Sequence, residues 1–312
     1  MYRGHFEKGD PDLEFAPVAR AIDIAHGAGI DKLGLMTPKW RPETKMRNFI
    51  WITAVAALAL GAAGCQKLQS RDQLNRGTQA FRNAQYAEAV EHFKTAVELD
   101  PTFPVARLYL ATAYMQQYIP GAESAENQQM AQAAYDNFMK VIEQDPKNTV
   151  ALASIASLML NEQKWDDAQQ WYEKLIAVDP NNADAYYSLG FIAWSKWYPA
   201  YGTARAELGM KPDDPGPLKD KKVREELKGR WLPVINGGLT ALDKTLQINP
   251  EYEDAMAYEN LLIRERADLL DSREAYDKDI KVANDWVQKN LDTKKIKAEP
   301  KENKSSGGIV AQ

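Results

Sequence analysis

The sequence predicts an all-α protein, a helix-turn-helix solenoid with insertions in its second and fourth repeats. Apolar residues recur at helical spacing over most of the chain after residue 65. Four segments end in an acidic or amide residue followed by proline, at Asp100-Pro101, Asp145-Pro146, Asp179-Pro180 and Asn249-Pro250. Small and large apolar residues recur at matching places before each pair. Such a pattern is typical of stacked repeats that bury their apolar faces against one another.

These repeats resemble the tetratricopeptide pattern, which has a period of about 34 residues. The first unit shows the pattern in Gly77, Ala80, Ala89, Phe93 and Ala96. Small residues let the two helices of a unit cross closely, and larger residues fill the space between units. On this pattern the repeats cover residues 70–103, 104–148, 149–182 and 183–252, and helices over residues 253–290 cap the array.

Two insertions interrupt the period, one near Ile119–Asn127 and one over Pro199–Arg230. The prolines and the glycine of Lys211–Pro217 exclude a regular helix, so we predict a loop there. A short helix over Lys219–Lys228 is predicted to follow it. Residues 291–312 are rich in lysine and have too few apolar side chains to pack, and we predict that they are disordered.

Residues 46–64 have the parts of a secretion signal. Arg47 precedes an apolar run over Phe49–Leu60, and small residues follow up to Cys65. The run is short for a bilayer span, which needs about 20 apolar residues. The segment Leu60–Cys65 resembles the lipobox of bacterial lipoproteins. The alternative is a buried apolar helix that ends in a free cysteine.

The lipobox resemblance implies that Cys65, the only cysteine, becomes the first residue of the mature chain and carries the lipid. The mature solenoid would then cover residues 65–290. It would be anchored in the bacterial cell envelope and face the periplasm. Gln66 stands where this class of lipoproteins has an aspartate for inner-membrane retention, so we expect the outer membrane.

Residues 1–45 differ from the rest of the chain. Asp12–Gly27 has helical spacing and Lys32–Thr37 is typical of a short strand, which together are too little to close a core. The segment Lys8–Leu35 resembles the C-terminal tail of ExbD/TolR biopolymer-transport proteins, without the transmembrane helix of that family. Our hypothesis is that Met46 is the true start and that residues 1–45 come from read-through of a neighbouring gene.

The tetratricopeptide resemblance implies that peptides or helices bind in a concave groove lined by the first helix of each unit. The Lys, Asn and Arg clamp of the chaperone-binding members is absent. Tyr187, Phe191, Trp194 and Tyr198 instead recur at i, i+4, i+7 and i+11 on one helix face. We interpret this aromatic stripe as a partner-binding groove. The alternative is that residues 199–230 fold over the stripe and bury it as core.

The composition excludes several classes of function. A formal net charge of −5 leaves no basic footprint, so we predict no nucleic-acid partner. One cysteine and three histidines give little material for a metal site or an activated nucleophile. We therefore predict no enzyme activity, no catalytic residue, no metal and no cofactor. The predicted function is a membrane-anchored scaffold for protein–protein interaction. The alternatives are a glycan or peptidoglycan binder that uses the aromatic stripe, or an accessory factor of an ExbB/ExbD-type transport system.

Overall fold

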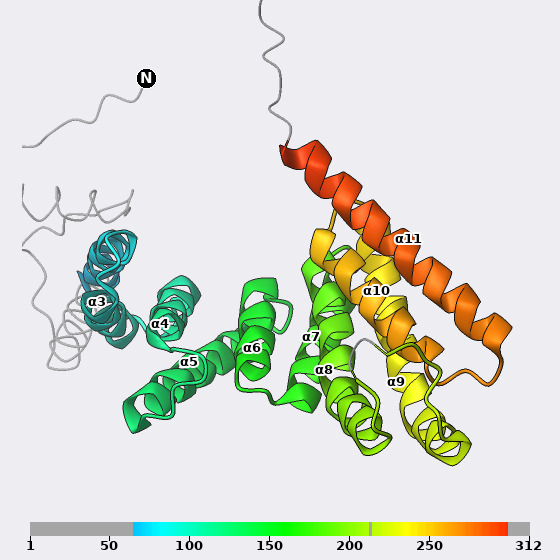
Figure 1. The fold of residues 1–312 in the computed structure, drawn as a ribbon. Helices are drawn as coiled ribbons and strands as arrows, with labels where there is room; N and C mark the ends of the chain where they lie inside the picture. Colours follow the sequence, from blue (N-terminus) through cyan, green and yellow to red (C-terminus); the bar gives the residue numbers. More distant parts are fainter. Residues whose placement is uncertain (1–64, 212–213, 299–312) are drawn as a thin grey trace, which may run out of the picture. The chain divides into compact units, whose positions relative to one another are not determined.

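The computed structural model describes residues 65–211 and 214–298 (Figure 1). Within these ranges the chain consists of helices and connecting turns, with no strand, which confirms the all-α prediction. No helix in these ranges is long and apolar enough to cross a membrane. The helix and strand predicted in residues 1–45, the signal of residues 46–64 and residues 299–312 lie outside the described residues.

The helices follow one another along the chain in pairs (Figure 1), joined by short turns except at the two insertions, which lie between α4 and α5 and between α8 and α9. In chain order they cover residues 65–82, α3 (Tyr86–Leu99), α4 (Pro104–Gln117), α5 (Ala125–Gln144), α6 (Thr149–Asn161), α7 (Trp165–Val178), α8 (Ala183–Glu207), α9 (Lys221–Ile248), α10 (Glu253–Ala267) and α11 (Arg273–Ala298). Most packing is between neighbours in this order, from α3 on α4 to α10 on α11. Such nearest-neighbour packing defines a solenoid, and the predicted fold class is confirmed.

The same turn ends four of the helices. The backbone N–H groups of Asp100, Asp145, Asp179 and Asn249 each donate to the helix carbonyl four residues earlier. In each turn the side-chain oxygen of this residue accepts from the N–H two residues later, at 3.1–3.4 Å. The intervening proline has no N–H and does not continue the helix. The Asx-Pro pairs of the sequence therefore set the ends of α3, α5, α7 and α9.

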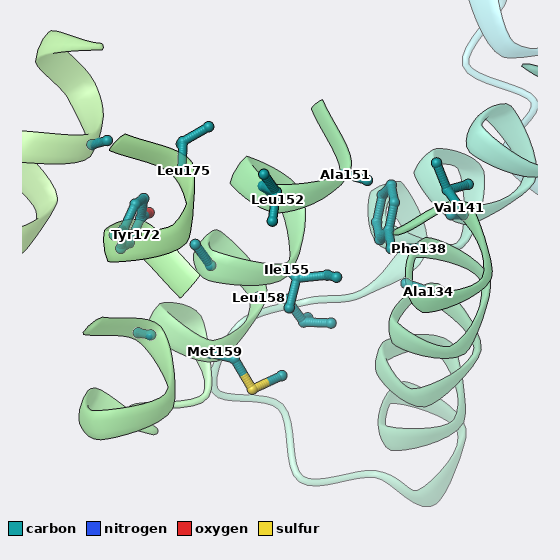
Figure 2. Close-up of a cluster of buried hydrophobic side chains, with 14 of the residues drawn as sticks. Ala134, Phe138, Val141, Ala151, Leu152, Ile155, Leu158, Met159, Tyr172 and Leu175 are labelled. Carbon is teal, nitrogen blue, oxygen red and sulfur yellow. The ribbon is translucent and has the colours of Figure 1, made fainter. Parts of the chain in front are cut away.

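The second and third repeats share one core (Figure 2). Phe138 of α5 lies against the face of α6 that carries Ile155 and Leu158, and all three side chains have no exposed surface. Tyr172 and Leu175 of α7 extend this core on the other side of α6. Full burial of such a side chain stabilises a fold by about 1.5–3 kcal/mol. The repeats are therefore held together by contacts that neither repeat can make alone.

The two helices of the fourth repeat cross at glycines. A Cβ atom on Gly190 of α8 would lie 2.4 Å from Cγ of Leu242 in α9. A Cβ atom on Gly238 of α9 would lie 2.6 Å from Cβ of Ala193. Both distances are far below contact distance, so only glycine allows α8 and α9 to approach this closely.

The insertion of the second repeat is a loop closed by one buried amide. Asn127, 6% exposed, accepts from the N–H of Ile119 at 2.7 Å. Its amide nitrogen donates to the carbonyls of Ile119 and Ala122, both at 2.8 Å. Ser124 caps α5 by accepting from the N–H of Asn127 at 3.2 Å. The insertion therefore ends at the capped first turn of α5.

In the insertion of the fourth repeat, the described residues of Lys211–Pro217 are non-helical, as predicted, but helix covers more of the insertion than predicted. α8 continues through Pro199 to Glu207, and α9 begins at Lys221 and continues through Pro233. The short helix predicted over Lys219–Lys228 is instead the first part of a helix of 28 residues. Proline inside a helix costs about 3 kcal/mol. Burial of Trp197 offsets part of this cost, because its side chain lies in the C-terminal core, which α8 to α11 form. Arg205, on the same extension, is buried and paired with Asp268.

The prediction of disorder from residue 291 is wrong over residues 291–298, which form the end of α11. The lysines of this stretch are good helix formers. Lys297 also crosses to α10, where its Nζ lies 2.9 Å from Oε1 of Glu253 and donates to the carbonyl of Glu251 at 2.8 Å. These contacts hold the last turns of α11 against the start of α10.

Candidate functional site

The four residues of the predicted stripe lie on one face of α8. Tyr187, Phe191 and Trp194 are partly buried, and Tyr198 is 46% exposed. The rings of Trp194 and Tyr198 are stacked, with centroids 4.7 Å apart. Phe191 and Trp194 lie 6.4 Å apart. Phe191, Trp194 and Tyr198 therefore form a row of neighbouring rings, and Tyr187 joins it through Tyr258, whose ring lies 5.9 Å from its own.

Three aromatic residues from neighbouring helices join this row, and the stripe alone did not reveal them. Tyr252, just before α10, stacks on Tyr187 with centroids 5.0 Å apart. Tyr258 of α10 meets Phe191 and Trp194 edge-on, at 5.4 Å from each. Trp165, the first residue of α7, meets Phe191 at 6.3 Å. We call these seven residues the aromatic cluster: Trp165, Tyr187, Phe191, Trp194, Tyr198, Tyr252 and Tyr258.

The inserted loop packs elsewhere. Met210 and Leu218 are buried in the C-terminal core with Trp197. The N–H of Leu218 donates to the carbonyl of Asp268 at 3.1 Å, and that of Gly216 donates to the Tyr276 hydroxyl at 2.9 Å. These contacts join the loop to the end of α10 and to α11. In the described part of the chain, the rings next to the stripe come from α7, α10 and the turn before α10, and from Tyr201 of the inserted segment, whose ring centroid lies 6.5 Å from that of Tyr198.

A groove of about 390 Å³ lies beside the cluster, between the α6–α7 turn and α8. Its apolar lining includes Leu160, Trp165, Tyr187 and Phe191. The turn is closed by the N–H of Lys164, which donates to the Met159 carbonyl at 2.9 Å. This turn places Trp165 at the start of α7, facing the rings of α8. We call this hollow the aromatic groove.

A larger hollow of about 730 Å³ lies between α5 and the α6–α7 turn. Its lining mixes polar side chains such as Asn127 and Gln132 with apolar ones such as Tyr135, Leu158 and Met159. The aromatic groove is instead lined by rings that contact rings of neighbouring helices, and this arrangement makes it the candidate site.

A buried carboxyl group accepts a hydrogen bond from one residue of the aromatic cluster. Glu265 of α10 is 5% exposed, and its Oε1 accepts a hydrogen bond from Nε1 of Trp194 at 3.1 Å. Its Oε2 has no hydrogen-bond partner among the described residues. Burial raises the pKa of Glu265 to about 7. The carboxyl thus fixes the orientation of the Trp194 ring.

A second buried carboxyl lies on the same helix. Glu259 is 2% exposed, and burial, followed by the negative charge of Asp243, raises its pKa to about 8. Helix α10 therefore carries two acids that hold a proton at a pH where ordinary glutamates have lost theirs.

We expect the C-terminal region to lose stability as the pH rises from about 5 to about 8. Over this range the folded chain keeps protons on Glu259 and Glu265 that the unfolded chain has released. Unfolding is therefore favoured as the pH increases, by on the order of 2–4 kcal/mol. Urea unfolding at several pH values measures this slope. Glu259→Gln is expected to flatten the slope and Glu226→Gln, on the exposed start of α9, to leave it unchanged. An equally steep slope in Glu259→Gln contradicts the assignment.

Two family models match the chain. One, described as tetratricopeptide repeat, matches residues 80–117. The other, described as TPR repeat, matches residues 160–196, from the end of α6 into α8. The fold is a tetratricopeptide solenoid. Both models describe a repeat, and neither describes an enzyme.

Solved structures share this tetratricopeptide fold. One crystal structure of MamA superposes with a TM-score of 0.50 and 16% identity, over 72% of this chain and 97% of that one. A second gives a TM-score of 0.51 and 16% identity, over 78% and 98%. At this identity the likeness concerns the fold alone.

Parts of longer proteins are similar in sequence. The mitochondrial import receptor subunit TOM70 of Rattus norvegicus is 30% identical over 105 residues, 34% of this chain and 17% of the receptor. That of Homo sapiens is 28% identical over 118 residues, 38% of this chain and 19% of the receptor. The chain thus matches less than a fifth of the length of these relatives.

The remaining predicted site residue is Cys65, the first residue that the structure describes. Its thiol is free and exposed. The signal that precedes it lies outside the described residues. Among residues 65–211 and 214–298, no three His, Cys, Asp or Glu side chains gather in a way that could hold a metal ion.

Proposed function

We propose that this protein is an interaction scaffold that binds a segment of a partner protein in the aromatic groove. The observation that carries the proposal is the row of partly exposed rings on α8, joined by rings from two neighbouring repeats. Contiguous exposed apolar patches mark interaction sites. Tryptophan and tyrosine are the residues most enriched among interface hot spots.

The rings are held in place before any partner binds. Glu265 fixes Trp194, and Asp184 accepts from the Tyr252 hydroxyl at 2.8 Å. A pre-organised surface loses less side-chain entropy on binding and therefore binds more tightly. This favours a defined binding site over a non-specific apolar patch.

The geometry favours a peptide over a sugar. Tyr187 stacks on Tyr252, and Trp194 stacks on Tyr198. Each stacked pair covers ring faces that a sugar ring would need for its own stacking. A peptide can instead place apolar side chains between ring edges and in the groove beside Phe191.

We expect Phe191→Ala to weaken peptide binding at least ten-fold, which is the effect of truncating a hot-spot residue. Peptides would be selected from a random display library on the purified unit of residues 64–312, and their affinities measured by fluorescence anisotropy. The matched control is Trp171→Ala on α7, outside the groove, where Lys174 lies over the ring at 3.6 Å. Its affinity should stay within two-fold of the parent. Equal losses in both variants, or no selected peptide, would contradict the proposal.

The proposal extends to the location of the scaffold, at the periplasmic face of the outer membrane and anchored by lipid on Cys65. The lipobox sequence and the exposed thiol support it. Stable anchoring needs more than one acyl chain, which lipoprotein processing would supply on this cysteine. We expect Cys65→Ser to move the protein from membranes to the soluble fraction after cell lysis and centrifugation. Intact-mass measurement of the parent should show the added lipid, and an unmodified Cys65 in the parent would refute this part.

A further inference from the structure

Two exposed carboxylates lie near the aromatic cluster. Asp184 lies in the first turn of α8 and Asp254 in the first turn of α10. Asp184 contacts the stacked pair directly, because it accepts the hydrogen bond of Tyr252. Asp254 lies close to the rings of the same region: burial and then its negative charge raise the pKa of Tyr258. Two negative charges therefore lie near the rings of Tyr187, Tyr252 and Tyr258.

Basic residues near the cluster are engaged elsewhere. Lys196 pairs with Asp166 at 2.6 Å, and Lys164 pairs with Glu162 at 3.0 Å. Within residues 65–211 and 214–298, no lysine, arginine or histidine forms an ion pair with Asp184 or Asp254. Acids in a first turn stabilise the helix dipole, which accounts for their presence on the helices. It does not account for their position beside the same aromatic rings.

We infer that the partner segment carries a basic side chain, arginine or lysine, next to an apolar one. This inference rests on the proposed function. The cation lies against the tyrosine rings and pairs with Asp184 and Asp254, because aromatic faces and carboxylates attract the same positive group. The neighbouring apolar side chain fills the groove at Phe191. Arginine fits best, since its planar guanidinium both stacks on rings and donates two parallel hydrogen bonds to a carboxylate.

The test is a double-mutant cycle with one of the selected peptides. We expect selected peptides to share an arginine or lysine at one fixed position. Replacing that residue by glutamine should lower the affinity at least ten-fold. Asp184→Asn with Asp254→Asn should cause a similar loss for the parent peptide and change the affinity for the glutamine peptide less than two-fold. Asp292→Asn, an exposed acid on α11, is the control and should leave both affinities unchanged.

Two results would overturn the inference and leave the proposed function intact. One is a set of peptides that depend on Phe191 but share no basic residue, or that bind the double Asp→Asn variant as well as the parent. The other concerns residues 299–312, which include Lys301 and Lys304 and follow the end of α11 beside Glu253. If removing residues 299–312 raises the affinity for the peptide ten-fold or more, the chain's own segment is the occupant. Unchanged affinity supports a separate partner.

Discussion

Arg205→Ala is expected to lower the free energy of unfolding of the C-terminal region by about 3–5 kcal/mol. The Arg205 side chain is 6% exposed and pairs with Asp268, whose side chain is 4% exposed. Tyr201 donates to the same carboxylate at 2.8 Å. The second guanidinium nitrogen of Arg205 donates to the carbonyls of Lys211 and Asp214 in the inserted loop. Without the guanidinium, a buried carboxylate loses its counter-charge and two carbonyls lose a hydrogen bond.

Urea unfolding followed by circular dichroism measures this loss. The matched control is Lys228→Ala, which removes the surface pair with Asp271 at 2.7 Å, a pair that is 33% and 54% exposed. Surface pairs of this kind contribute about 0–1 kcal/mol. A loss of less than about 1 kcal/mol in Arg205→Ala would show that the loop is not held through this arginine.

Trp197→Ala is expected to destabilise the fold by about 3–5 kcal/mol. Its side chain is fully buried, 5.4 Å from the ring of Tyr201 and 6.0 Å from that of Trp231. Truncation leaves a large cavity at the point where α8 meets α9 and the inserted loop. Trp194, three residues earlier on the same helix, is only partly buried and lies against rings of the aromatic cluster. Trp194→Ala should cost less than half as much stability.

The two tryptophan variants separate folding from binding. In thermal unfolding, Trp197→Ala should lose more stability than Trp194→Ala. At a temperature where both variants are folded, Trp194→Ala should lose more peptide affinity than Trp197→Ala. If both variants lose stability equally, Trp194 is part of the core and the stripe is not a binding surface.

Local patterns explain why the fold could be predicted from the sequence. The turn after Asp145 or Asp179 forms within a few residues, from the Asx side chain and the proline that follows. The close helix crossing at Gly190 could also be predicted, since such a crossing needs a small residue. The path of α8 through Pro199 was not readable, because it depends on burial against segments far along the chain. The same holds for the end of α11, which depends on the contact of Lys297 with Glu253.

The four stripe residues of the aromatic cluster could likewise be predicted from the sequence. The stripe follows helical periodicity within α8, so its four residues could be assigned to one face. Tyr252 and Glu265 lie 65 or more positions from their partners Tyr187 and Trp194 in the chain. No local pattern connects such pairs. The only signal for the additional rings is that aromatic residues also occur near the matching positions of the next repeat.

The central claim is that the aromatic groove holds a partner protein, and photo-crosslinking tests it most directly. A benzophenone amino acid would replace Phe191 in the full chain expressed in its native cell, and Trp171 in a control. The account predicts one discrete crosslinked product from position 191, absent from position 171 and competed by a selected peptide. Crosslinks from position 191 that stay within the chain, or that match those from position 171, would contradict it.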